Sequence, residues 1–256
     1  MPDYSYVDQP YFLQMLFYPR PDFTIPPDNA FDLLIDTGDD ARVAARFYSG
    51  DKQWPWILYF HGNGEVASDY DDLSALYFSQ SINLVVADYR GYGSSSGTPD
   101  FTSMVNDAHH VYGVVKNELE KRSYNSDLYI MGRSLGSISA LELAFHHQKT
   151  FKGLIIESGF ASINRLIYHL GIMKPNPDLD QIERECLEMI AEIRIPALII
   201  HGGSDNLVLP GEGKLVYDTL GSSDKEMVII PRAGHNDVIV RDIPKYFGAI
   251  KKLVSK

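Results

Sequence analysis

The sequence of 256 residues carries 23 Lys and Arg against 34 Asp and Glu, a formal net charge of −11, and 45 % of its residues are hydrophobic. These proportions are those of an ordinary globular protein and disfavour the disordered, collagenous and coiled-coil classes. Because phosphate binding needs clustered basic residues, the acid excess argues against a nucleic-acid partner. The single cysteine, Cys186, excludes both an intrachain disulfide and a zinc cluster built from cysteines.

The first thirty residues hold neither the basic start nor the apolar centre of a secretion signal, and we expect a cytoplasmic protein. No stretch of the sequence approaches the ~20 apolar residues that span a bilayer, so no transmembrane segment is expected. The apolar stretch 11–18 lies between Pro10 and Pro19. We expect it to pack, with the rest of an N-terminal extension over residues 1–30, on the domain. Contact of 11–18 with a membrane surface is the alternative.

Apolar strands alternate with amphipathic helices along the rest of the chain. Strands are predicted at 31–36, 42–48, 54–60, 82–87, 128–131, 154–156, 197–200 and 227–230, and helices at 104–119, 138–145 and 243–253. This alternation predicts an α/β fold: a single domain over residues 1–256 with a mostly parallel eight-stranded sheet and helices on both faces. In such a sheet, ligands bind at the carboxyl ends of the strands. Functional residues are therefore expected just after the strands.

The connection between the sixth and seventh strands, about 160–195, is long for a simple crossover. Two amphipathic segments lie in it, and the stretch 174–177 contains two prolines that separate them. Because a crossover needs one helix, we interpret the additional helix as a small helical lid that offers an apolar wall to a substrate.

A nucleophile motif follows the predicted strand 128–131. Residues 132–136 read Gly-Arg-Ser-Leu-Gly, which fits G-x-S-x-G, and a helix begins directly after them. In this motif a sharp strand-to-helix turn holds the serine in a strained backbone conformation, and small flanking residues avoid a clash. Ser134 is the predicted nucleophile.

A serine hydroxyl needs a base to accept its proton and an acid to orient that base. His235 follows the last strand, and Asp205 follows the seventh strand in His-Gly-Gly-Ser-Asp; both are expected in loops at strand ends. We assign His235 as the base and Asp205 as the acid. Glu157, at the end of the sixth strand, and Asp237 are rival acids, and Glu157 is expected instead to pair with Arg133.

Two backbone N–H groups must stabilise the oxyanion that forms when the serine attacks. Leu135 follows the nucleophile at a helix N-terminus and is expected to supply one of them. The other is expected from the loop that reads His61-Gly-Asn-Gly, where the two glycines let the backbone curl. Within that loop we favour the amide of Asn63 over that of Gly64.

Together these motifs resemble the α/β-hydrolase family, from about Phe31 to the C-terminus. The chain looks most like the small serine hydrolases that pair an HGNG loop with a GRSLG elbow, a subgroup associated with carboxylic esters and acyl thioesters. The resemblance implies a small-molecule ester or thioester substrate, an acyl-enzyme intermediate, and neither cofactor nor metal. Three alternatives stay open: a peptidase or amidase with the same triad, transfer of the acyl group to another alcohol, and a catalytically silent binding protein.

The remaining histidines are interpreted as structural. The rings of His61 and His201 are expected to bond loop backbone. The pairs 109–110 and 146–147 lie on predicted helices, and neighbouring residues on a helix do not face each other, so no metal site is expected there. Cys186 is expected to be a small apolar residue.

Overall fold

The computed structural model describes residues 2–255, and its centre is an eight-stranded sheet. The strands are β1 (Ala30–Asp36), β2 (Arg42–Tyr48), β3 (Trp56–Phe60), β4 (Asn83–Ala87), β5 (Leu128–Arg133), β6 (Phe151–Glu157), β7 (Ala197–Gly202) and β8 (Lys225–Ile230). Their order in the sheet is β1-β2-β4-β3-β5-β6-β7-β8. The six strands β4, β3, β5, β6, β7 and β8 run parallel to one another. Strand β2 pairs antiparallel with both β1 and β4.

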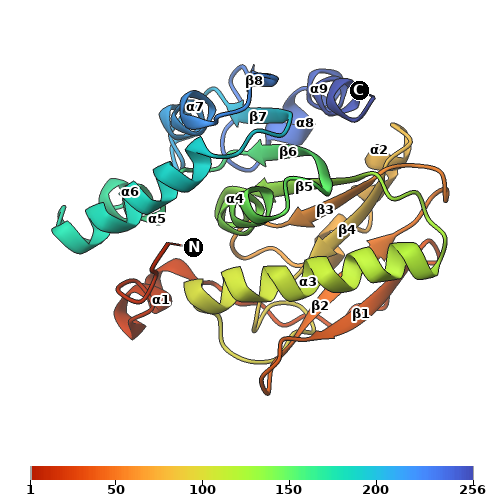
Figure 1. Cartoon of the computed structure of the whole chain (residues 1–256), viewed down its shortest axis with the longest axis horizontal. Coiled ribbons are helices and arrows are strands. Elements are labelled where there is room, and N and C mark those ends of the chain that lie inside the picture. Colours follow the sequence, from red (N-terminus) through yellow and green to blue (C-terminus); the bar gives the residue numbers. More distant parts are fainter. Residues whose placement is uncertain (1, 256) are drawn as a thin grey trace.

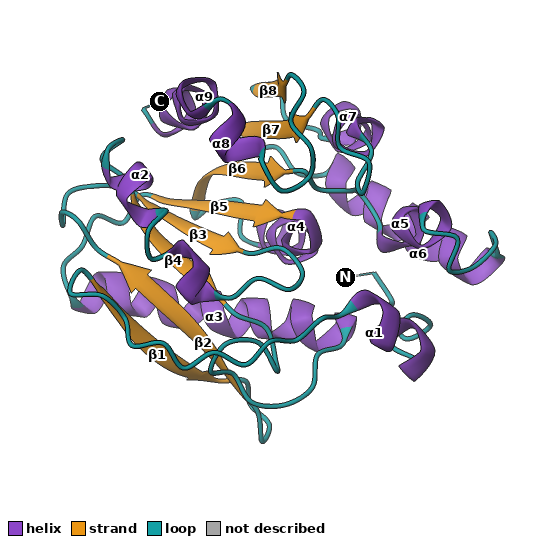
Figure 2. Ribbon diagram, turned by 180° about the vertical axis from the view of Figure 1, so that it is seen from behind, coloured by secondary structure: helices purple, strands orange, loops and turns teal. Residues whose placement is uncertain are grey.

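Two layers of helices cover the sheet (Figure 1). The helices are α1 (Pro10–Leu16), α2 (Ser74–Phe78), α3 (Phe101–Lys121), α4 (Ser137–His146), α5 (Ile163–His169), α6 (Pro177–Ala191), α7 (Pro210–Thr219), α8 (Val238–Arg241) and α9 (Ile243–Val254), with short 3₁₀ turns η1 (Ala67–Tyr70) and η2 (Ser134–Gly136). One apolar core packs the helices α1, α3, α4, α5, α6 and α7 against one face of the sheet. A second core joins η1, α2, α8 and α9 to the other face (Figure 2).

The predicted α/β fold is confirmed: one domain with a mostly parallel eight-stranded sheet and helices around it. The hairpin of β1 and β2 turns through Gly38, whose φ of +84° favours glycine. Sequence reasoning missed α7, because glycines at 211 and 213 weaken its helical signal. It also missed the short helices α1, α2 and α8, which offer too few residues for a periodic pattern.

The N-terminal segment and the α5–α6 segment lie near each other, beyond the carboxyl ends of the parallel strands (Figures 1 and 2). The hydroxyl of Tyr11 donates to the carbonyl of Ile172 at 3.2 Å. Phe12 and Leu16 are buried in the core, whereas Tyr11 and Tyr18 are exposed. On α6 the apolar side, including Cys186, is buried as well. Among residues 2–255, no helix is both long and apolar enough to cross a membrane.

Candidate active site

Ser134 lies at the sharp turn between β5 and the η2–α4 helical run. Its φ is +51°, a left-handed conformation that is strained for a residue with a Cβ. Glycines on both sides allow this turn: a Cβ at Gly132 would overlap the carbonyl of Gly136, and a Cβ at Gly136 would overlap the carbonyl of Phe60. The two glycines of the motif therefore let the elbow pack directly against itself and the end of β3.

The structure brings the three predicted triad residues together. The Oγ of Ser134 lies 2.9 Å from Nε2 of His235. On the other side of the ring, Nδ1 of His235 lies 2.8 Å from Oδ2 of Asp205. These residues come from the ends of β5, β7 and β8, which are separated by long stretches of sequence. The arrangement can pass a proton from a serine hydroxyl to an imidazole held in one tautomer by a carboxylate.

Asp205 is buried and surrounded by donors. Its Oδ1 accepts from the backbone N–H groups of Leu207 and Val208 at 3.0 and 2.9 Å. Nε2 of His201 lies 3.4 Å from Oδ2. Burial by itself would raise the pKa of Asp205, but the hydrogen bonds from His201 and His235 outweigh it and hold that pKa well below its usual range. The carboxylate thus stays ionised beside His235.

The rival acids lie elsewhere. Glu157 accepts from the hydroxyl of Tyr246 at 2.5 Å, and its other oxygen lies 3.3 Å from Nε of Arg133, so the predicted pairing with Arg133 is confirmed. Asp237 accepts from the backbone N–H of Gly234 at 2.6 Å and so closes the turn that contains His235. Within residues 2–255, the carboxylate that contacts the ring of His235 is that of Asp205.

Arg133 links the elbow to the histidine loop. Its guanidinium is buried and pairs with Glu65 and Glu157. It also donates to the carbonyl of His235 and to Oδ1 of Asn236, both at 2.9 Å. Burial alone would raise the pKa of Glu65, but the Arg133 charge keeps it below its usual value, whereas burial raises the pKa of Glu157. With its N–H groups occupied in this way, Arg133 positions the loop of His235.

The loop after β3 forms a tight turn around Asn63. Gly64 has a φ of +76°, and the N–H of Gly62 donates to Glu65 at 2.8 Å. The Asn63 side chain points to the N-terminal segment: it accepts from the N–H of Tyr18 at 3.0 Å and donates to the carbonyl of Leu16 at 2.9 Å. The side chain of Asn63 therefore anchors this loop to the N-terminal segment. The backbone N–H of Asn63 is a separate group, and it is the predicted oxyanion donor.

Sequence reasoning missed part of this anchorage. The hydroxyl of Tyr92 donates to Oδ1 of Asn63 at 2.6 Å, and its ring packs 5.7 Å from that of His61. Tyr92 lies in the glycine-rich stretch that follows β4. The only available signal was that this stretch also follows a parallel strand next to β3, so that its side chains reach the same edge of the sheet.

The other polar candidates have structural surroundings. Nδ1 of His61 lies 2.8 Å from the carbonyl of Gly62, and Nε2 of His201 lies 2.9 Å from the carbonyl of Val208, so both rings bond loop backbone as expected. Burial raises the pKa of the Cys186 thiol to about 11, which makes it a poor nucleophile at neutral pH.

The sheet order, the elbow after β5 and the helical layers define an α/β-hydrolase fold. The model of the family "Serine aminopeptidase, S33" matches residues 53–176 and 178–239, and the chain belongs to that family of α/β hydrolases.

Two curated relatives and one solved structure illustrate the similarity. A putative α/β hydrolase of Acanthamoeba polyphaga mimivirus is 29% identical over 202 residues, which cover 75% of this chain and 73% of the relative. Protein bem46 of Schizosaccharomyces pombe is 27% identical over 215 residues, covering 79% and 68%. The structure of the Pyrococcus furiosus esterase Pf2001 superposes with a TM-score of 0.73 at 16% identity and covers 93% of this chain and 98% of that one. These similarities support a hydrolase.

Proposed function

We propose that the protein is a serine hydrolase that cleaves carboxylic esters or acyl thioesters through an acyl-enzyme. The observation that carries the proposal is the continuous contact of Ser134 with His235, and of His235 with Asp205, at 2.9 and 2.8 Å. These separations are within the range required for proton transfer between a nucleophile and its base.

In the proposed mechanism, Oγ of Ser134 attacks the carbonyl carbon while Nε2 of His235 takes the hydroxyl proton. Asp205 accepts a hydrogen bond from Nδ1 and stabilises the imidazolium that forms. The amides of Asn63 and Leu135 stabilise the oxyanion of the tetrahedral intermediate. When that intermediate collapses, His235 donates the proton to the leaving alcohol or thiol. A water molecule then attacks the acyl-enzyme by the same steps and releases the acid.

Exposed apolar side chains around the site favour an acyl group over a charged substrate. Tyr18 is exposed beside Asn63, and Leu207 and Leu209 are exposed beside Asp205. Leu170, which directly follows α5, is exposed, and the neighbouring His169 contacts the carbonyl of Asn206 at 3.0 Å. We propose that α5 and these loops form the small lid and the apolar wall for the acyl chain.

Hydrolysis of peptides or amides is the second candidate, because the matching family model is named for a serine aminopeptidase. An aminopeptidase needs a carboxylate for the substrate ammonium. Near α5, Glu183 and Glu212 are instead paired with Arg165 at 2.9 and 2.5 Å. The structural similarity to an esterase and the apolar rim favour esters.

The test combines active-site labelling with substrate panels. Wild type, Ser134→Ala and the matched control Ser126→Ala, an exposed serine before β5, are treated with a fluorophosphonate. The same proteins are then assayed on aryl esters and acyl thioesters of graded length and on amino-acid amides. We expect labelling of wild type and Ser126→Ala only, and a kcat for Ser134→Ala that is about 10⁴- to 10⁶-fold lower.

Two results would overturn parts of the proposal. Equal labelling of wild type and Ser134→Ala would reject the nucleophile. Labelling of Ser134 together with faster turnover of amides than of esters would reject the substrate class and establish the peptidase alternative.

A further inference from the structure

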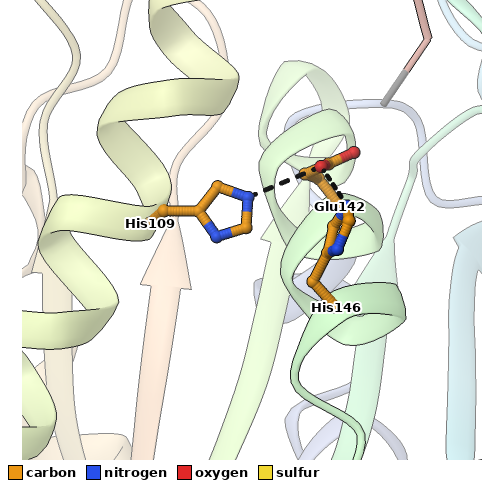
Figure 3. Close-up of side chains that lie close together, drawn as sticks. All are labelled: His109, Glu142 and His146. Atoms are coloured by element: carbon orange, nitrogen blue, oxygen red, sulfur yellow. Dashed lines mark hydrogen bonds and ion pairs between the residues drawn. The ribbon is translucent and has the colours of Figure 1, made fainter.

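A second group of histidine and carboxylate side chains lies between helices α3 and α4, outside the Ser134 site. His109 extends from α3 toward α4, where Glu142 and His146 lie one helical turn apart (Figure 3). Nε2 of His146 lies 2.8 Å, and Nε2 of His109 3.5 Å, from the same oxygen of Glu142. One nitrogen from each histidine and one carboxylate oxygen all lie within 4.8 Å of one another. The proposed hydrolysis uses none of these groups.

Glu142 is the unusual member of this cluster. Only 1 % of the residue is exposed, and its Oε2 has no hydrogen-bond partner within residues 2–255. A buried carboxylate is costly unless a cation or several donors compensate its charge. Within the described part of the chain, Glu142 forms ion pairs with the imidazoles of His109 and His146, and both contact Oε1. The environment therefore favours a cation that compensates the charge of this buried carboxylate.

We propose that His109, Glu142 and His146 bind a divalent transition-metal ion of the zinc type. Two imidazole nitrogens and one carboxylate oxygen form a common ligand set for Zn²⁺, with solvent in the fourth position. Ligand atoms in a tetrahedral zinc site lie roughly 3.3 Å apart. The distances from Oε1 to the two imidazole nitrogens, 2.8 and 3.5 Å, bracket this value, and all three ligand atoms lie within 4.8 Å of one another, so side-chain rotations would be needed to complete the coordination geometry.

A second histidine contact supports the ligand role of His109. Its Nδ1 lies 3.0 Å from Nε2 of His147. If Nδ1 carries the proton and donates it to His147, the lone pair of Nε2 points to Glu142 and is free to coordinate. Metal-binding histidines typically donate their second ring N–H to such a partner, which fixes the tautomer and the orientation of the ring.

The site is accessible and connects two elements of the fold. The side chains of His109 and His146 are 31% and 40% exposed, so an ion can enter from solvent, whereas Glu142 forms the buried floor. A bound ion would join α3 to α4, and α4 begins directly after the serine elbow. The metal is therefore proposed as a structural clamp on the helix layer that supports the elbow.

The test measures metal binding directly and needs no enzymatic activity. Chelator-treated full-length protein is titrated calorimetrically with Zn²⁺ alone, and Co²⁺ is used as a probe because its visible absorption reports tetrahedral coordination. Wild type is compared with Glu142→Gln and His146→Gln, and with the matched control His110→Gln, the exposed neighbour of His109 on α3. We expect one equivalent bound by wild type and His110→Gln, and affinity at least about tenfold lower in both cluster variants.

Control measurements keep the outcome decisive. Circular dichroism establishes that each variant folds, and His146→Gln, at an exposed position, serves if Glu142→Gln does not fold. Absence of a stoichiometric Zn²⁺ site in wild type would overturn the proposal. Equal affinity of wild type and folded His146→Gln would overturn it too, because the ion would then bind elsewhere, for example at His235.

Discussion

Among residues 2–255, two clusters place a buried carboxylate against two histidines, and they differ in how the oxygens of the carboxylate are hydrogen-bonded. Oδ1 of Asp205 accepts from two backbone N–H groups, and its Oδ2 faces His235 and His201. Glu142 directs one oxygen to two imidazoles and leaves the other without a partner within residues 2–255. Both clusters join a carboxylate to imidazoles, but among residues 2–255 backbone N–H groups donate to Asp205 and not to Glu142.

The difference in hydrogen bonding suits the two carboxylates to different roles. A carboxylate surrounded by fixed donors keeps its charge and its position, which suits it to orient one histidine through a reaction. A buried carboxylate with a free oxygen gains most from a ligand that brings positive charge. The contrast therefore predicts catalysis at the first cluster and cation binding at the second, and substitutions can test each side.

The largest effect is expected from removal of the charge of Asp205. Asp205→Asn should lower kcat on the best ester by about 10⁴-fold, because an amide favours the wrong tautomer of His235. Glu142→Gln is the equivalent change in the other cluster. It should leave kcat within about threefold, because the proposed hydrolysis uses none of the groups in that cluster. Steady-state kinetics on both variants measure the contrast. An unchanged rate for Asp205→Asn would transfer the acid role to another carboxylate.

Loss of the Arg133 cation is expected to have the next largest effect. Arg133→Met would leave Glu65 and Glu157 without the guanidinium that compensates their charge, so that, like Glu142, they would lack a permanently charged partner. Removal of one partner from a buried pair costs about 3–5 kcal/mol of unfolding free energy. The control Arg241→Met removes a half-exposed pair with Asp237 and should cost at most about 1 kcal/mol. Urea unfolding of both variants measures the difference, and equal losses would contradict this account of Arg133.

Much of the fold could be predicted because the apolar pattern is strong where strands are buried on both faces. The strands β3, β4 and β7 consist entirely of buried residues, and their apolar stretches predict strands at 54–60, 82–87 and 197–200. Strand β6 was predicted too short, because Lys152 and Gly153 interrupt its pattern, although its hydrogen bonds with β5 begin at Phe151. Pairing with a strand that is distant in sequence leaves no signal in the residues next to Phe151.

The candidate triad could be predicted because its residues follow strands in a fixed order, and the structure places Ser134, His235 and Asp205 in contact. The α3–α4 cluster could not be predicted from neighbouring residues. The adjacent pairs 109–110 and 146–147 were judged separately, whereas the structure joins one member of each pair across two helices. The spacing of Glu142 and His146, four residues apart, was the available local signal, and the position of His109 depends on helix packing.

The smallest expected effect concerns the stability of the protein after metal removal. In chelator-treated protein, Glu142→Gln removes a buried charge and provides an amide N–H group that can donate to a neighbour. The free energy of unfolding should stay unchanged or rise by up to about 1 kcal/mol. With saturating Zn²⁺ the order should reverse, because only wild type gains stability from the bound ion. Thermal unfolding of both proteins with chelator and with Zn²⁺ measures these differences. A loss of more than about 2 kcal/mol in the chelator-treated variant would contradict the comparison. Such a loss would mean that the two imidazoles already stabilise the carboxylate of Glu142 without a metal ion, as the backbone donors stabilise that of Asp205.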